Sequence, residues 1–201
     1  MKKFILTAVA VFAMVAPAHA AVLFSDDFNS YAPALNWNGS GTWTTGNSVD
    51  LVASSTFNLT CAGGAGNCVD LSASSSGFIS RSLTLAAGIY QLSFDYTGNQ
   101  LGSQFPLAGF TASVGSLVAN IGPLANNSSA FTSYSGTFTT AGPTTLTFTQ
   151  NGGDNFRGSI LDNVVVASIP EPATWLLMIA GFGLVGGTMR RRKPVASLSF
   201  S

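Results

Sequence analysis

Aspartates are the residues between positions 21 and 169 whose side chains could do chemistry. The seven are Asp26, Asp27, Asp50, Asp70, Asp95, Asp154 and Asp162, and this range has no glutamate, lysine or histidine. Their spacing forms no local carboxylate pair of the kind that glycoside hydrolysis needs, and no G-x-S-x-G element presents a nucleophilic serine. We therefore predict that the protein is not an enzyme.

The same range is acidic, although the whole chain is formally neutral. Arg81 and Arg157 are its cations, which gives a net charge of −5, and the remaining basic residues lie near the two ends of the chain. An acidic domain without lysine offers no electrostatic surface to a phosphate backbone. We predict no nucleic-acid partner.

Two tryptophans and two cysteines are further candidates for function. Trp37 and Trp43 flank a Gly-Ser-Gly turn, where exposed rings could serve as platforms for a glycan; the alternative is core packing. Cys61 and Cys68 are the only cysteines, and in an exported chain such a pair indicates a disulfide, here closing the loop 62–67. A metal site at the cysteines would need further ligands nearby.

Alternating apolar and small polar residues predict that strands position these side chains. In residues 89–97 the apolar residues Tyr90, Leu92, Phe94 and Tyr96 share one face, and Leu146 and Phe148 alternate with threonines in the same way. Glycine and proline mark the turns between such segments. We expect an all-β fold, a jelly-roll β-sandwich over residues 21–168 with eight to ten short strands.

Residues 1–20 have the features of a signal peptide. Lys2 and Lys3 precede an apolar run over residues 4–16, and Ala18-His19-Ala20 fits the small-residue rule for signal peptidase. The alternative, a first transmembrane helix, needs a longer run to cross about 30 Å of hydrocarbon. Cleavage after Ala20 removes His19, the one histidine of the chain, so the mature protein would have no histidine base or metal ligand.

Residues 169–201 form a distinct C-terminal segment. Pro170, Glu171 and Pro172 precede Trp175, an uncharged apolar stretch at about 173–189, and the basic tail 190–193 with Arg190, Arg191 and Arg192. The prolines separate this segment from the last strand, and the apolar stretch is near the lower length limit for a membrane-spanning helix. We predict a single transmembrane helix in the inner membrane with a cytoplasmic basic tail.

The ordered combination of Pro170-Glu171-Pro172, Trp175, a short glycine-rich span and the arginine cluster resembles the PEP-CTERM sorting domain of Gram-negative bacteria. It is most similar to the subtype with tryptophan three residues after the second proline. The resemblance implies an exosortase, an inner-membrane cysteine protease that processes its substrates near Pro-Glu-Pro. The alternative is an ordinary single-pass anchor that is never cut.

Four segments of the exported range resemble galactose-binding-like jelly rolls, a group that includes carbohydrate-binding modules. These are residues 47–51, 68–71, the strand around Tyr90, and 158–164. Such folds often hold one calcium ion between the start of the first strand and the last strand. The resemblance makes Asp26, Asp27 and Asp162 candidate ligands of a structural Ca²⁺. The alternative is that Asp26 and Asp27 are solvated in an entry loop and that Asp162 faces water or caps a turn.

The leading hypothesis is a non-enzymatic protein of the cell envelope or biofilm matrix. It would be exported, anchored at least transiently in the inner membrane, processed by an exosortase, and delivered to the cell surface or beyond. The family's association with exopolysaccharide is implied by the resemblance alone. A second hypothesis is a carbohydrate-binding module that recognises polysaccharide through Trp37 and Trp43, and a third is a plain anchored structural protein.

Overall fold

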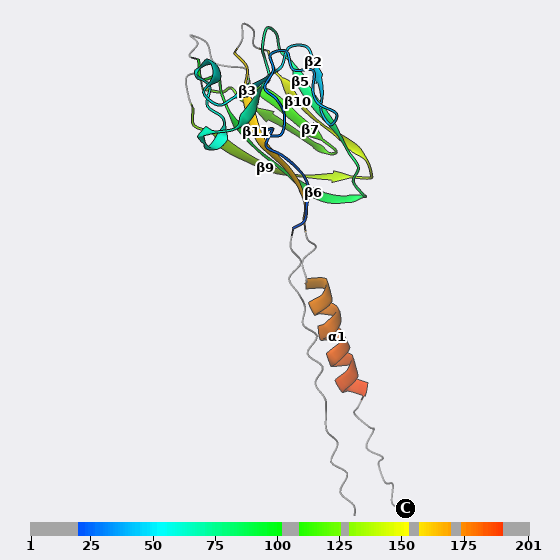
Figure 1. Ribbon diagram of the computed structural model, residues 1–201. Helices are drawn as coiled ribbons and strands as arrows, with labels where there is room; N and C mark the ends of the chain where they lie inside the picture. Colours follow the sequence, from blue (N-terminus) through cyan, green and yellow to red (C-terminus); the bar gives the residue numbers. More distant parts are fainter. Residues whose placement is uncertain (1–19, 102–108, 126–128, 153–156, 170–173, 191–201) are drawn as a thin grey trace, which may run out of the picture. The chain divides into compact units, whose positions relative to one another are not determined.

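The computed structural model describes residues 20–101, 109–125, 129–152, 157–169 and 174–190 (Figure 1). Ala20–Ile169 form one compact unit, and the helix α1 (Thr174–Arg190) belongs to a second. Residues 1–19 of the expected signal peptide lie outside the described residues, as do Pro170, Glu171, Pro172, Arg191 and Arg192 of the sorting motif.

The unit Ala20–Ile169 consists of antiparallel strands and two short 3₁₀ turns. The strands are β1 (Val22–Asp26), β2 (Thr44–Gly46), β3 (Asp50–Ala53), β4 (Asn67–Asp70), β5 (Phe78–Leu83), β6 (Gly88–Thr97), β7 (Phe110–Val114), β8 (Leu117–Ile121), β9 (Thr132–Thr140), β10 (Thr144–Gln150) and β11 (Ile160–Ser168). The turns are η1 (Thr56–Asn58) and η2 (Ala62–Gly64), both between β3 and β4. The predicted all-β class is confirmed.

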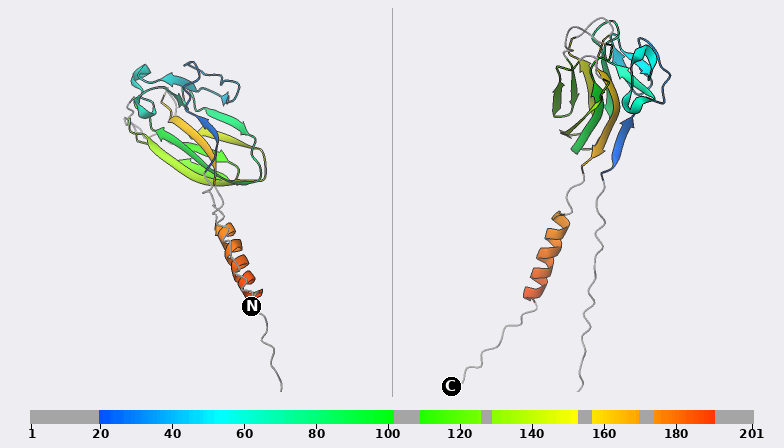
Figure 2. Two further views of the ribbon diagram at one scale, coloured as in Figure 1. Left: turned by 60° about the horizontal axis from the view of Figure 1, so that its bottom comes forward. Right: turned by 90° about the vertical axis from the view of Figure 1, so that its left-hand side faces the viewer.

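Two sheets form the sandwich (Figure 2). One has the order β3-β4-β11-β6-β9, with β1 also paired to β11, and the other has the order β2-β5-β10-β7-β8. Every pairing is antiparallel, and many neighbours in a sheet are distant in sequence, such as β4 and β11. Neighbouring strands that are distant in sequence arise when the chain crosses from one sheet to the other, and this arrangement is typical of a jelly roll.

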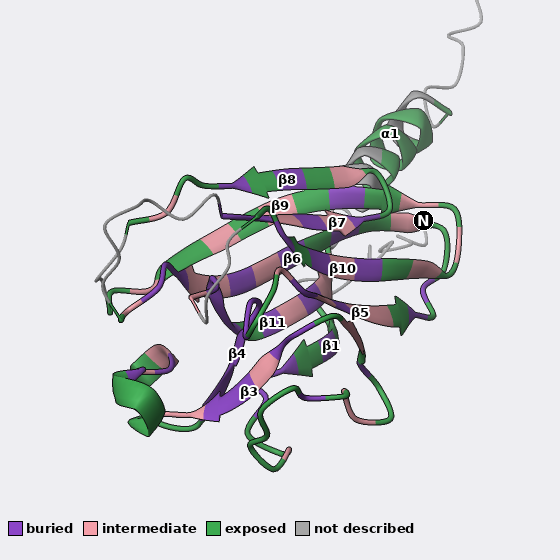
Figure 3. Cartoon of the chain, turned by 90° about the horizontal axis from the view of Figure 1, so that it is seen from above, coloured by how far each residue is buried: buried purple, intermediate pink, exposed green. Residues whose placement is uncertain are grey.

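The core between the sheets follows from the alternation along the strands (Figure 3). On β6, Tyr90, Leu92 and Phe94 are buried, whereas the intervening Gln91 is exposed. On β10, Leu146 and Phe148 are buried in the same way. Because successive side chains point to opposite faces of a strand, this alternation fixes which face each strand turns toward the core.

The long loop between β1 and β2 is held against the sandwich rather than left open. Its Gly39 has a φ of 80°, and a side chain there would collide with the carbonyl oxygen of Trp43. A residue at such a φ is strained unless it is glycine. The glycine therefore permits the turn that carries Trp43 from the loop into the core.

Helix α1 covers most of the stretch in which we predicted a transmembrane span. It has 17 residues, among them Trp175 and, in its last turn, Arg190. In the parts of the chain that the structure describes, no helix is long and apolar enough to cross a membrane.

Candidate functional site

Trp37 and Trp43 are buried, so the prediction that they form surface platforms for a glycan is wrong. Their exposed fractions are 6% and 3%. Trp37 packs edge-on against Phe28 with ring centroids 6.5 Å apart, and Trp43 lies 5.9 Å from Phe24. The alternative, core packing, is the one that the structure supports, because neither indole has a free face for a sugar.

A hydrogen bond to Asp26 allows the Trp43 indole to be buried. The Trp43 indole Nε1–H donates to Asp26 Oδ2 over 2.8 Å, and the Tyr31 hydroxyl donates to the same oxygen over 2.6 Å. The Phe28 amide donates to Asp26 Oδ1, and an Arg81 guanidinium nitrogen lies 4.0 Å from Oδ2. The carboxylate of Asp26 thus ties the loop between β1 and β2 to the sandwich.

The three aspartates expected to bind calcium do not converge. Asp26 is occupied as above, Asp27 accepts from the Asn29 amide and side chain, and Asp162 accepts from the amides of Ala62 and Asn163. Their carboxylates do not form a group within 4.8 Å, the arrangement that brings together Cys61, Cys68 and Asp162 in the described residues. The three carboxylates are therefore not placed as common ligands of one ion.

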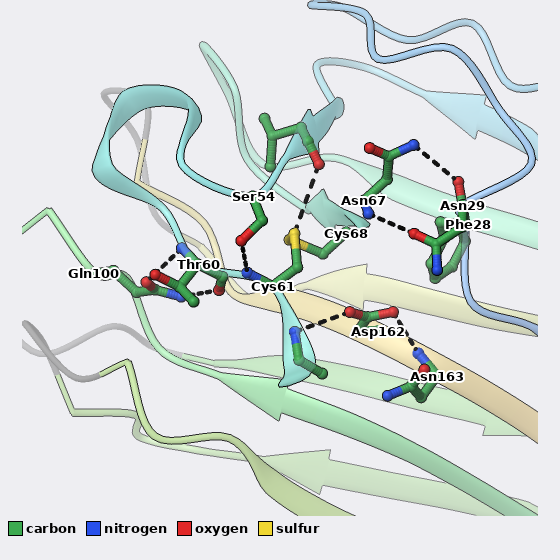
Figure 4. The surroundings of a disulfide bond; sticks show 12 residues. Phe28, Asn29, Ser54, Thr60, Cys61, Asn67, Cys68, Gln100, Asp162 and Asn163 are labelled. Atoms are coloured by element: carbon green, nitrogen blue, oxygen red, sulfur yellow. Dashed lines mark hydrogen bonds between the residues drawn. A yellow bond between two sulfur atoms is a disulfide. The ribbon is translucent and has the colours of Figure 1, made fainter. Parts of the chain in front are cut away.

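The predicted disulfide between Cys61 and Cys68 is confirmed. Its sulfur atoms are bonded and both residues are buried (Figure 4). Because disulfide sulfurs have no thiolate to offer, the group with Asp162 is not a metal site. Instead Asp162 Oδ2 accepts from the Ala62 amide over 3.0 Å and holds the disulfide loop onto β11. Burial raises the pKa of Asp162 to about 6, against these amide hydrogen bonds, which lower it.

A pocket of about 360 Å³ lies beside this disulfide-linked region, and we call it the Asp50–Asp70 pocket. Its apolar lining consists of Leu35, Val52, Phe57, Leu59, Ala73 and Leu101. Its polar lining consists of Asn36, Asp50, Asp70 and Ser74. A mostly apolar pocket of a few hundred Å³ with a few polar groups is typical of a small-ligand site.

The strand register brings the two carboxylates of this pocket together. Asp50 on β3 pairs directly with Asp70 on β4. Asp50 Oδ1 accepts from the Asn36 amide over 2.7 Å, and Asp70 Oδ1 accepts from the Ser72 amide over 2.9 Å. Backbone donors therefore hold both carboxylates in fixed orientations.

Burial dominates the electrostatics of the pair. Asp70 is 4% exposed, and this burial raises its pKa to about 7, with the negative charge of Asp50 acting in the same direction and the amides of Ser72 and Gly158 opposing it. Burial also raises the pKa of Asp50, against the Asn36 amide. In the described residues the one ion pair joins Arg81 to Asp26, so neither pocket carboxylate is paired with a cation there.

Phe57 stands at the pocket with its side chain 56% exposed. It lies in η1, with a φ of 54°. A non-glycine residue in this left-handed region is uncommon, and for a bulky side chain it costs free energy. An exposed aromatic ring held at such a φ is a candidate contact for a ligand.

This pocket was not predicted from the sequence. Asp50 and Asp70 were predicted neither as ligands nor as a pair, and the segments that contain them pointed only to a type of fold. A local signal exists, because Val-Asp-Leu occurs at both 49–51 and 69–71. In each segment an aspartate stands between two apolar residues, a local pattern that can be recognised in the sequence. That the two aspartates lie opposite each other depends on the register of β3 with β4, which the local pattern does not give.

Comparison with solved structures supports the β-sandwich fold. The K2 cleaved adhesin domain of Lys-gingipain superposes with a TM-score of 0.52 at 13% identity, over 73% of this chain and 99% of that domain. TmCBM61 in complex with β-1,4-galactotriose has a TM-score of 0.48 at 14% identity, over 63% and 88% of the two chains. A carbohydrate-binding module of a Cellvibrio mixtus lichenase, in complex with cellotriose, has a TM-score of 0.44 at 14% identity, over 75% and 100%. Likeness at these identities shows the fold alone.

The C-terminal segment has a closer match. A family model described as the PEP-CTERM protein-sorting motif matches residues 168–193, which confirms the resemblance inferred from Pro170 to Lys193. No curated protein matches the chain. In sequence, a PEP-CTERM sorting motif follows the jelly-roll sandwich. This motif indicates an exported protein that is sorted at a membrane.

Proposed function

We propose that the protein is a non-enzymatic component of the cell envelope or biofilm matrix and a substrate of an exosortase. The observation that carries this proposal is the PEP-CTERM motif at residues 168–193. Signal peptidase removes the N-terminal segment, the C-terminal segment is held at the inner membrane at least transiently, and the exosortase cuts near Pro-Glu-Pro. The sandwich then reaches the cell surface or the exterior.

The order of elements supports this route. The last strand of the sandwich ends at Ser168, immediately before the motif, and the apolar helix α1 ends at Arg190. Ala21 at the start of the sandwich is tied to this same end, since the Ser168 amide donates to the Ala21 carbonyl oxygen over 2.9 Å. Both cuts therefore fall at the border of the compact unit and leave its core intact.

The intact mass of the mature protein, purified from a host that has an exosortase, tests both cuts together. We expect an N-terminus at Ala21 and loss of the tail that contains Arg190. A variant with Pro170→Ala and Pro172→Ala should keep the tail, whereas the control Thr174→Ala should lose it. If every wild-type molecule keeps Arg190 to Lys193, the protein is an uncut anchored protein and the proposed processing is wrong.

A second candidate function is polysaccharide binding by the sandwich, and the Asp50–Asp70 pocket favours it. Sugars present both apolar C–H faces and hydroxyl groups, and the pocket offers the exposed Phe57 ring beside Asn36, Asp50 and Ser74. Since Trp37 and Trp43 are buried, this pocket replaces them as the candidate glycan site.

A glycan array tests this second candidate. We expect the wild-type protein to bind at least one polysaccharide and Phe57→Ala to lose that binding. Val118→Ala is the matched control, because Val118 is also a well-exposed apolar residue, 65% exposed, but lies on β8 in the other sheet. Binding that survives Phe57→Ala would exclude the pocket as the glycan site.

A further inference from the structure

We infer that the Asp50–Asp70 pocket recognises a glycan through an unacetylated amino sugar, whose ammonium group is bound between the two carboxylates. This inference rests on the polysaccharide-binding candidate above and names the class of sugar. Four observations carry it: the convergence of the carboxylates, the absence of a cationic side chain paired with either of them in the described residues, their fixed orientation, and the apolar walls around them.

The first observation is that two carboxyl groups are held side by side. Residues directly opposite each other on antiparallel strands have Cβ atoms about 5 Å apart, and Asp50 and Asp70 are such a pair and line the same pocket. Like charges directly opposite each other are destabilising in a sheet. A cation placed between them would turn this repulsion into two attractions.

The second observation concerns where that cation comes from. Arg81 lies against Asp26 and over the Phe24 ring, and the described residues contain no other ion pair. The range 21–169 has one further cation, Arg157, against seven aspartates. The sandwich is therefore poor in positive charge, and the missing counter-charge fits a ligand.

The third observation is preorganisation. The amides of Asn36 and Ser72 fix one oxygen of each carboxylate, so the acceptors need not reorganise when a donor arrives. The ionisable group that acts on Asp70 is Asp50 on β3, and the amide of Gly158, two residues before β11 begins, also donates to Asp70. A bound ammonium would favour the ionised form of both acids, so its binding near neutral pH should release protons.

The fourth observation is that the pocket walls are mostly apolar, which favours a sugar over a metal ion as the ligand. Calcium prefers six to eight oxygen ligands, whereas most of this pocket is apolar. An ammonium on a carbohydrate ring can donate to both carboxylates while the ring packs on Leu35 and Phe57, both well exposed. The volume of about 360 Å³ accommodates a small ligand such as a sugar ring.

The substituent at the sugar carbon that carries the nitrogen then decides which sugar binds. An acetamide group in place of the ammonium is neutral and bulkier, and it leaves the two carboxylates without a counter-charge. A hydroxyl group at the same carbon can donate one hydrogen bond but carries no charge. Both replacements should weaken binding, since hydrogen bonds to ionised partners are roughly twice as strong as neutral ones.

Isothermal titration calorimetry tests the inference with three β-1,4-linked oligosaccharides of equal length, which are built from glucosamine, N-acetylglucosamine and glucose. The full-length chain is used in a nonionic detergent at mildly acidic pH, where the free amine is protonated. We expect the glucosamine oligomer to bind at least about tenfold more tightly than the other two. Titration in two buffers that differ in ionisation enthalpy should report net proton release for this ligand alone.

Two isosteric variants and a control locate the effect. Asp50→Asn and Asp70→Asn should each lower the affinity for the glucosamine oligomer by about 30-fold or more. Asp95→Asn should not change it, because Asp95 bonds to Ser133 and Asn163 and does not line the pocket. A thermal-unfolding scan of each variant confirms that it is folded, and Asp70→Asn should fold at least as well as the wild type, since burial raises the pKa of Asp70 to about 7 and the acid is therefore mostly neutral at mildly acidic pH.

The outcomes separate this inference from the function on which it rests. Equal binding of all three oligosaccharides, lost on Phe57→Ala, would overturn the amino-sugar inference and leave a general glycan site. Binding of no oligosaccharide, here or on the glycan array, would overturn both. Tighter binding of the glucosamine oligomer that Asp50→Asn and Asp70→Asn do not weaken would place its site elsewhere and also overturn the inference.

Discussion

The regions around Asp26 and around Asp70 place the same side chain in opposite settings. Both residues are buried, and both carboxylates accept backbone amides. Asp26 additionally accepts from the Tyr31 hydroxyl and the Trp43 indole and faces Arg81. Asp70 instead faces a second carboxylate, that of Asp50, across apolar walls.

This difference separates a structural carboxylate from a candidate binding carboxylate. A buried charge is tolerated when donors and a counter-charge compensate it, and Asp26 has both. A buried charge without a counter-charge costs stability, so a protein that retains one at a pocket has a reason outside its fold.

The largest expected effect comes from Asp26→Ala. It leaves the Trp43 indole and the Phe28 amide without their acceptor, the Tyr31 hydroxyl with Thr42 as its remaining partner, and Arg81 without its ion-pair partner. We expect the free energy of unfolding to fall by about 5 kcal/mol, since each buried donor left unpaired costs about 1–3 kcal/mol. Urea denaturation followed by tryptophan fluorescence measures it.

Asp27→Ala is the control for this loss. Asp27 is adjacent in sequence but exposed, and its carboxylate accepts hydrogen bonds from the amide and side chain of Asn29. Its removal should change the free energy of unfolding by no more than about 0.5 kcal/mol. Equal losses for the two variants would show that Asp26 does not tie the loop to the sandwich.

The second prediction concerns the pH dependence of stability that Asp70 causes. Because its pKa is raised from 3.8 to about 7 by folding, the native state binds more protons than the unfolded state between these values. The ionised form is the one that burial disfavours, so this contribution lowers stability as the pH rises from about 4 to about 7. Three pKa units correspond to roughly 4 kcal/mol at most.

Asp70→Asn removes this ionisation and keeps the shape of the side chain. The variant should exceed the wild type in free energy of unfolding by up to roughly 4 kcal/mol above pH 7, and the difference should vanish near pH 4. Urea titrations at several pH values measure the difference between the two proteins, so effects of the other aspartates cancel. A difference that is the same at pH 4 and pH 8 would contradict the raised pKa.

The contrast between these regions also shows how far the sequence could predict the molecule. The fold was predictable, because the alternation at Tyr90, Leu92 and Phe94 is local and each strand needs only one apolar face. The disulfide was predictable because two cysteines in an exported chain have one possible pairing. Both inferences depend on residues close together in sequence.

The wrong prediction for Trp37 and Trp43 and the missed pocket have one cause. In both cases the environment of a side chain depends on residues that are distant in sequence. Trp43 is buried because an acceptor 17 residues earlier, Asp26, satisfies its indole N–H. Asp50 and Asp70 form a pair because β3 and β4 run antiparallel in one particular register. Neither relationship is visible in local composition, since a tryptophan beside glycines fits a surface turn equally well.

The third prediction concerns the disulfide that borders the pocket region. Replacing both Cys61 and Cys68 by alanine reopens a loop of about eight residues and should lower the free energy of unfolding by about 2.5 kcal/mol. The Asp26 region should be unaffected, so the fluorescence of the buried tryptophans in the native state should not change. Urea denaturation with and without a reductant checks the result: the reductant should destabilise the wild type toward the variant and leave the variant unchanged.

The sharpest comparison involves two phenylalanines with nearly the same φ, and one of them gives the smallest expected change in stability. Phe28 has a φ of 58° and Phe57 a φ of 54°. Phe28 is fully buried in the Asp26 region, where the core gains from its ring, whereas Phe57 is mostly exposed at the pocket. Glycine adopts a positive φ without strain, so a glycine substitution relieves the same backbone cost at both positions and removes a different amount of packing.

Phe28→Gly should therefore lower the free energy of unfolding by about 3–5 kcal/mol, and Phe57→Gly should raise it by up to about 1 kcal/mol. The second variant should nevertheless lose glycan binding. A gain in stability with a loss of binding would mean that Phe57 is held at an unfavourable φ for the sake of its exposed ring, as stability and function trade off at sites under local strain. A fall of about 2 kcal/mol or more for Phe57→Gly would instead assign Phe57 to the packing of η1 and weaken the case for a ligand at this pocket.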